Sequence, residues 1–106
     1  MNILIGDLEF EGPWHESEQV CSEPGILAVL YERSGEFELV ELIESDNLAD
    51  TADSVFATAE DSSMLAITAL AAHYTADLTA AERTEIVEEL LNVFDREPLT
   101  APYAVA

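Results

Sequence analysis

The stretch Glu23-Pro-Gly-Ile-Leu-Ala-Val-Leu-Tyr31, followed by Glu36-Phe-Glu-Leu-Val-Glu-Leu-Ile-Glu-Ser45, decides the fold of this chain. Two apolar runs with Arg33-Ser34-Gly35 between them predict a β-hairpin. Glycine supplies the left-handed residue that a three-residue hairpin loop needs. The other segments of the chain can be placed around this hairpin.

The expected register of the hairpin pairs Glu32 with Glu36 across the loop, which sets Leu27 opposite Glu41. Successive residues of a strand point to opposite faces of the sheet. In this register both faces carry mostly apolar side chains. We therefore expect helices to cover the hairpin on both sides.

Two later segments show helical spacing of apolar residues. The first runs from residue 48 to residue 59, after the capping residues Ser45-Asp46-Asn47. The second begins with Thr79-Ala-Ala-Glu82, which spells a capping box. Met64 to Leu70 is an apolar run of strand length, and residues 1–10 suggest an edge strand or an extended arm. The predicted fold is α+β, a small three-stranded antiparallel sheet flanked by helices.

Arg83 falls near the middle of the apolar stripe of the second helix. A buried guanidinium needs a carboxylate or backbone oxygens, because an unpaired buried charge costs several kcal/mol. Glu41 is the lone charge on the hairpin face that carries Leu27, so we expect it to pair with Arg83.

The composition is strongly acidic. The 106 residues include 23 Asp and Glu but only three arginines and no lysine, which gives a net charge of −20. Apolar residues make up 49% of the chain. That apolar content predicts a folded single domain rather than a disordered chain. The pattern is typical of cytoplasmic proteins of salt-in halophiles, because salt screens the repulsion between exposed carboxylates. The alternative is a mimic of nucleic acid that binds a basic partner, but the carboxylates are spread from Asp7 to Glu97.

The single cysteine, Cys21, cannot form an internal disulfide, which favours a reducing compartment. We expect Cys21 to be a small buried side chain. No stretch of the sequence reaches the length of a membrane span. The expected location is therefore the cytoplasm, with no membrane partner.

The order hairpin, helix, strand, helix resembles the GIY-YIG nuclease fold over about residues 8–98, which leaves an apolar tail over residues 99–106. The resemblance rests on four short matches: Gly12-Pro13, Pro24-Gly25-Ile26, Glu44-Ser-Asp-Asn-Leu48 and Glu82-Arg83. It implies a nuclease-type α+β fold for a single domain, residues 1–106.

Members of that family cleave nucleic acids with a metal ion, two tyrosines, an arginine and a metal-binding glutamate. Carried over to this sequence, the two tyrosine motifs correspond to Gly25-Ile26-Leu27 and Glu41-Leu42-Ile43, so leucine and glutamate replace the tyrosines. The arginine position falls at about Thr51. The metal-binding glutamate corresponds to Glu88 or Glu89, where the simpler interpretation is a solvated acidic helix face.

The resulting expectation is a non-catalytic GIY-YIG-like module without a cofactor, which binds a protein partner or nucleic acid. A protein partner or self-association is favoured, because nucleic-acid binding draws on Lys and Arg that release counterions. One alternative is a metal-dependent endonuclease with a site rebuilt around Glu41 and Glu88, with Glu88 and Glu89 as candidate ligands of Mg²⁺ or Mn²⁺. Another is a structural subunit that dimerises through the tail or the two-sided sheet.

Overall fold

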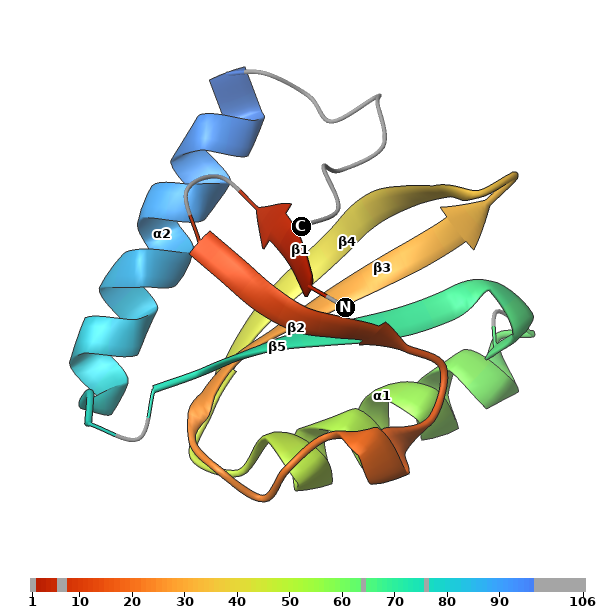
Figure 1. Ribbon diagram of the computed structural model, residues 1–106, viewed down its shortest axis with the longest axis horizontal. Coiled ribbons are helices and arrows are strands. Elements are labelled where there is room, and N and C mark those ends of the chain that lie inside the picture. Colours follow the sequence, from red (N-terminus) through yellow and green to blue (C-terminus); the bar gives the residue numbers. More distant parts are fainter. Residues whose placement is uncertain (1, 6–7, 64, 76, 97–106) are drawn as a thin grey trace.

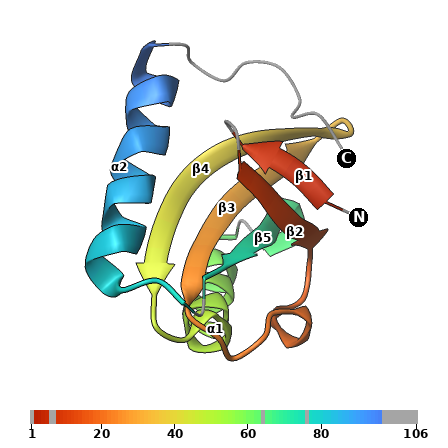
Figure 2. The ribbon, with the colours of Figure 1, turned by 60° about the vertical axis from the view of Figure 1, so that its left-hand side comes forward.

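The computed structural model describes residues 2–5, 8–63, 65–75 and 77–96. Within these residues, the centre of the molecule is one antiparallel sheet of five strands in the order β1-β2-β5-β3-β4. The strands are β1 (Asn2–Ile5), β2 (Leu8–Trp14), β3 (Gly25–Arg33), β4 (Glu36–Ser45) and β5 (Thr68–Tyr74). The sheet is strongly curled and forms half of a barrel (Figure 1, Figure 2).

The predicted three-stranded sheet is wrong, because the residues ahead of the hairpin supply two further strands. β1 pairs with β2, and β2 pairs with β5, where Trp14 lies opposite Leu70. In the sequence, Gly6-Asp7 stands between β1 and β2. Such a dipeptide between two apolar runs is typical of a two-residue hairpin loop. This was the local signal for the additional strands.

The β3–β4 hairpin turns through two residues rather than three. Ser34 and Gly35 both have positive φ, 55° and 80°, and Arg33 pairs directly with Glu36. A type I′ turn needs positive φ at both central positions, and its twist matches that of the flanking strands. The tighter turn moves the whole register by one residue.

A β-bulge at Val40 changes the register again. Around it, Leu30 lies opposite Leu39 and Val29 lies opposite Glu41. Val40 is therefore an extra residue on β4, and beyond it Leu27 pairs with Ile43. The predicted pairing of Leu27 with Glu41 is wrong. That prediction assumed a three-residue turn and regular pairing along both strands, so it included neither the two-residue turn nor the bulge.

The two predicted helices are confirmed. They are α1 (Leu48–Asp61) and α2 (Ala80–Arg96). The Asn47 side chain caps α1 by accepting a hydrogen bond from the Asp50 amide at 3.3 Å. At α2 the capping box is reciprocal: the Glu82 amide donates to the Thr79 hydroxyl at 3.2 Å, and the Thr79 amide donates to the Glu82 carboxylate at 3.1 Å. Both signals were local in sequence, which is why they could be predicted.

The strand predicted over Met64 to Leu70 exists but lies further along the chain. Residues Leu65–Ile67 form a 3-10 turn, and β5 begins at Thr68 and extends to Tyr74. Three alanines of β5, Ala69, Ala71 and Ala72, are fully buried, and their small side chains allow close packing.

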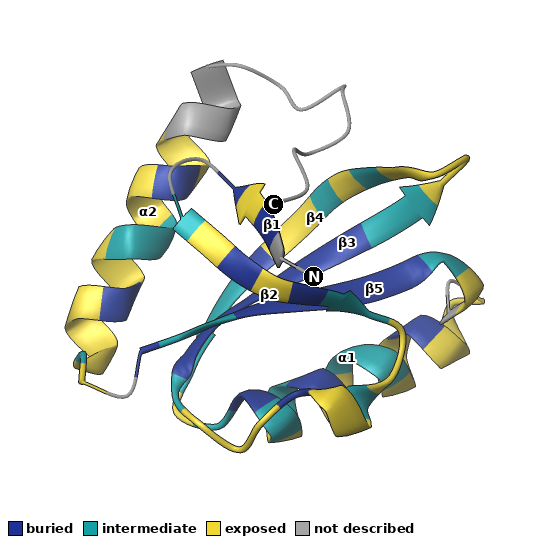
Figure 3. Cartoon of the chain, viewed as in Figure 1, coloured by how far each residue is buried: buried dark blue, intermediate teal, exposed yellow. Residues whose placement is uncertain are grey.

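Each face of the β3–β4 hairpin packs into its own core. Figure 3 shows the buried residues along β3 and β5. The core on the α2 side contains Ile3, Ile5, Phe10, Ile26, Ala28, Leu30, Leu42, Ala69, Ala71 and Leu90. The core on the α1 side contains Val20, Leu27, Val29, Leu48, Ala52, Leu70 and Ala72. No helix in the described part of the chain is long and apolar enough to cross a membrane.

Arg83 is 2% exposed and joins the start of α2 to the end of β4. Its guanidinium pairs with Glu44 at 2.8 Å and with Asp46, and it donates to the Leu78 carbonyl at 2.8 Å. The prediction that Arg83 pairs with Glu41 is wrong. Glu44 faces the α2 side of the hairpin, whereas Glu41 contributes to a pocket on the α1 side.

Cys21 is exposed, so its predicted burial is also wrong. Its backbone amide donates to the Tyr74 hydroxyl at 3.0 Å, which ties the segment before β3 to the end of β5. Tyr74 packs against the core on the α1 side. Burial raises the pKa of Tyr74 to about 12, because the tyrosinate loses hydration there.

This shift predicts a loss of stability at high pH. The pKa of an unfolded tyrosine is about 10, whereas the pKa of folded Tyr74 is raised to about 12. Between these values the folded state binds more protons, so the free energy of unfolding falls as pH rises. We expect denaturation in buffered KCl to show this fall, and Tyr74→Phe to reduce its slope. Equal slopes for both proteins would contradict the assignment.

Candidate functional site

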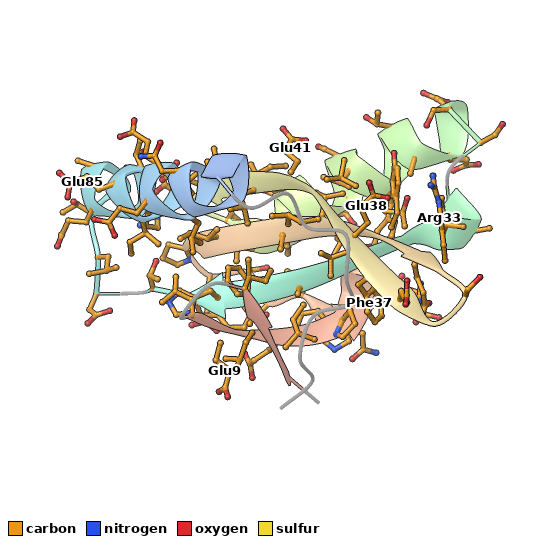
Figure 4. All side chains as sticks on the ribbon, turned by 90° about the horizontal axis from the view of Figure 1, so that it is seen from above. Glu9, Arg33, Phe37, Glu38, Glu41 and Glu85 are labelled. Carbon is orange, nitrogen blue, oxygen red and sulfur yellow. The ribbon has the colours of Figure 1, made fainter. Side chains whose placement is uncertain are left out.

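A pocket of about 330 Å³ lies between α1 and the outer half of the β3–β4 hairpin. This volume is at the lower end of the range for ligand sites. Its lining comes from β3, β4, α1 and the start of β5: Val29, Tyr31, Val40, Glu41, Ile43, Thr51, Ser54, Val55, Thr58, Ala59, Ser62 and Thr68. In Figure 4 the Glu41 side chain points outward from the ribbon.

The bulge on β4 helps to shape this pocket. Val40 and Glu41 are consecutive residues, yet both line it. In a regular strand they would point to opposite faces of the sheet. The extra residue turns one of these two side chains toward the other face of the sheet, as bulges beside binding sites commonly do. The same bulge lets Phe37 and Leu39 pack against the core on the α2 side.

One side of the pocket is a row of hydroxyl groups on α1 and on its C-cap residue Ser62. Thr51, Ser54, Thr58 and Ser62 are spaced by three or four residues, which places them on one helix face. The Thr51 hydroxyl donates to the Ser45 hydroxyl at 2.8 Å, and the Ser62 hydroxyl donates to the Ala59 carbonyl at 3.3 Å. Within the described residues, the side chains of Ser54 and Thr58 form no hydrogen bond. These two exposed groups can therefore bind a ligand.

The floor of the pocket is apolar and its only charge is a carboxylate. Val29, Ile43 and Val55 contribute aliphatic surface, and Glu41 is the one carboxylic acid in the lining. Among the described residues, Glu41 has neither an ion pair nor a hydrogen bond. An exposed carboxylate beside apolar surface, with no cationic side chain in the lining, gives the pocket a negative potential that favours a positively charged ligand.

The rim beside Tyr31 is different, because its carboxylate already has a partner. Arg33 lies 3.8 Å from Glu38 and stacks over the Tyr31 ring at 5.6 Å from the ring centroid. Figure 4 shows Arg33 and Glu38 near one another at the hairpin end. Glu38 thus has a cationic neighbour, whereas Glu41 has none among the described residues.

The structure separates the residues expected to form a catalytic site. Glu41 and Thr51 share the pocket, whereas Leu27 is fully buried in the core on the α1 side. Glu88 and Glu89 are exposed on α2, which packs on the opposite face of the hairpin. The structure therefore does not bring Glu41 and either helical glutamate together. Over the described ranges, no group of three or more His, Cys, Asp or Glu could hold a metal ion.

The pocket offers both polar and apolar groups to a ligand. Hydrolysis of a phosphodiester needs a general base, a cation to stabilise the developing charge and a group that activates the leaving oxygen. The pocket supplies one carboxylate, several hydroxyls and apolar surface. Sequence analysis missed the hydroxyl row, although the spacing of Thr51, Ser54, Thr58 and Ser62 was visible in the sequence.

Comparisons with protein-family models, with curated proteins and with solved structures found no match for this chain. The resemblance to the GIY-YIG nuclease family therefore stays a prediction from the sequence. The small three-stranded sheet that accompanied it is excluded by the five-stranded order of the described strands.

Proposed function

We propose that this protein is a non-catalytic binding module that captures an extended segment of a partner protein along β4, with one side chain of that segment in the pocket. The observation that carries the proposal is the position of the pocket. It lies beside an edge strand, and its lining includes Val40, Glu41 and Ile43 of that strand.

Strand β4 is suited to accept another strand. Across the described residues it pairs only with β3, so its other edge offers backbone donors and acceptors. Extended segments add to such edges through main-chain hydrogen bonds, and neighbouring pockets select their side chains. Val40 is 46% exposed at this edge and offers apolar surface to such a segment.

The charge of the chain indicates the conditions for this binding. A net charge of −20 repels acidic partners and favours a neutral or basic segment. We place the working environment in concentrated salt, in a reducing cytoplasm that suits the exposed Cys21. Nucleic acid is disfavoured, because the two arginines with described side chains, Arg33 and Arg83, already pair with carboxylates.

Filling the pocket tests the proposal. A displayed library of random peptides is selected on the native protein in KCl of about 1 M, where exposed charges are screened. We expect the selected peptides to bind the Thr58→Trp variant at least about tenfold more weakly, a loss of about 1.4 kcal/mol. Thr58 is exposed and lines the pocket, so the indole occupies the binding volume.

The matched control is Ala57→Trp, which adds the same side chain at an exposed α1 position outside the pocket lining. It should leave binding unchanged. Peptides that bind Thr58→Trp as tightly as the native protein would overturn the proposal. So would a dimer, measured by light scattering, that dissociates in Thr58→Trp, because a second copy would then occupy the pocket.

A further inference from the structure

We infer that the pocket takes up an arginine side chain of the partner segment, with the aliphatic stem on the apolar floor and the guanidinium against Glu41. This inference rests on the proposed function and names the residue that anchors the partner. Its basis is the combination of features in one pocket: aliphatic floor, free hydroxyls and a carboxylate without a partner.

The apolar floor selects a side chain with a hydrocarbon stem. Val29, Ile43 and Val55 line the pocket together with the methyl group of Ala59. A small inorganic cation would leave this surface in contact with water, whereas the methylene groups of arginine or lysine cover it. The site therefore favours an amphipathic cation over a simple ion.

The polar rim favours arginine over lysine. A guanidinium has five donors in a planar fork that matches a carboxylate in a bidentate manner. Glu41 offers the carboxylate, and Ser54 and Thr58 offer hydroxyl oxygens that accept no protein hydrogen bond in the described structure. Lysine has a compact, strongly hydrated ammonium, so it gains less from a partly apolar site.

The edge strand adds the matching geometry. A segment paired with β4 places alternate side chains on the α1 face, where the pocket lies. The carboxylate of Glu41 comes from the same strand that would hold the backbone of the segment. Backbone pairing and the ion pair therefore reinforce one another, and the charge sets which residue occupies the pocket.

The test compares two synthetic peptides that differ only in the central residue of an alternating Thr-Val sequence, which is arginine in one and citrulline in the other. Citrulline has nearly the same shape as arginine but is neutral. Titrations are done in KCl of about 1 M, where the Debye length of about 3 Å removes long-range attraction to the acidic surface. We expect the arginine peptide to bind about tenfold more tightly, equivalent to about 1.4 kcal/mol.

The variant Glu41→Gln should abolish this preference and bring the two affinities together. The matched control is Glu85→Gln, which removes the same charge from an exposed position on α2, away from the pocket (Figure 4). It should keep the preference. A double-mutant cycle between Glu41 and the peptide arginine then measures the coupling directly.

The outcomes separate the two proposals. Equal binding of the two peptides to the native protein, with both weakened by Thr58→Trp, overturns the arginine inference and leaves the proposed function standing. Binding that is insensitive to Thr58→Trp, or no binding of either peptide, overturns both. A preference for arginine that survives Glu41→Gln overturns the role of Glu41.

Discussion

Replacing Gly25 with alanine is expected to lower the free energy of unfolding by about 2–4 kcal/mol. A Cβ atom at this position would lie 2.3 Å from the His73 carbonyl oxygen and 3.0 Å from the Leu48 side chain. The first contact is with backbone of the neighbouring strand, so it cannot be relieved by rotating a side chain. The alanine must therefore push β3 away from β5.

The damage should spread through the sheet, because Gly25 pairs with Ser45 on β4 and with Tyr74 on β5. Urea denaturation followed by circular dichroism in concentrated KCl measures the loss. The matched control is Gly35→Asn, at a turn position with φ of 80° and no atom within 4 Å of an added Cβ. Asparagine tolerates this conformation, so we expect a cost below about 1 kcal/mol.

A native-like stability for Gly25→Ala would show that β3 and β5 are not held at this separation. Equal losses in Gly25→Ala and Gly35→Asn would also contradict this explanation, because an added Cβ meets neighbouring atoms only at the first of these two positions. The comparison thus separates close packing from a general effect of replacing glycine.

Replacing Arg83 with alanine is expected to cost about 2–4 kcal/mol, because it breaks a buried charge network and removes a packed side chain. The guanidinium satisfies Glu44, Asp46 and the Leu78 carbonyl at once. Removing one partner of a buried pair usually costs the most when the remaining charge stays buried. Here the two carboxylates differ in that respect.

The Glu44 side chain is only 24% exposed, whereas the Asp46 side chain is 89% exposed. Loss of Arg83 therefore leaves Glu44 poorly hydrated, but Asp46 returns to water. We expect Asp46→Asn to cost less than about 1 kcal/mol, as exposed ion pairs do. Glu44→Gln should cost more, because the buried Arg83 then loses the carboxylate that contacts both its Nε and its Nη2 atoms.

Arg83→Met separates packing from charge, since it keeps an aliphatic stem of similar length. We expect it to recover part of the loss of Arg83→Ala but not all of it, because the Leu78 carbonyl and Glu44 remain without a donor. Thermal and urea unfolding of the variants measure the order of their stabilities. Equal stabilities of Asp46→Asn and Arg83→Ala would show that the network does not act through its buried atoms.

Prediction from sequence succeeded where the signal was local. The capping residue of α1, the capping box of α2 and the apolar spacing of both helices each lie within a few residues, and the structure confirms these helices. The hairpin was found for the same reason. The length of the hairpin loop was predicted wrongly, because Ser34 adopts a positive φ that serine rarely takes. No local sequence signal indicates this conformation.

The sequence did not predict the pocket beside β4. Glu41 and Thr51 were singled out, and both line the pocket, but as members of a binding surface that includes Ser54 and Thr58. Glu88 and Glu89 lie elsewhere, because the orientation of α2 follows from packing against β4 rather than from the residues of the helix alone. The partner of Arg83 could not be predicted while the strand register was wrong.

The sequence by itself determined the acidic surface, the two helices with their caps, and the presence of a hairpin. These depend on composition and on contacts between residues close in the chain. The tertiary structure decided the strand order, the bulge at Val40, the Arg83 network and the pocket beside β4. The physical reason is that strands distant in sequence compete for the same edges. A shift of one residue also exchanges the two faces of a strand, so only the packing of the whole core selects the register.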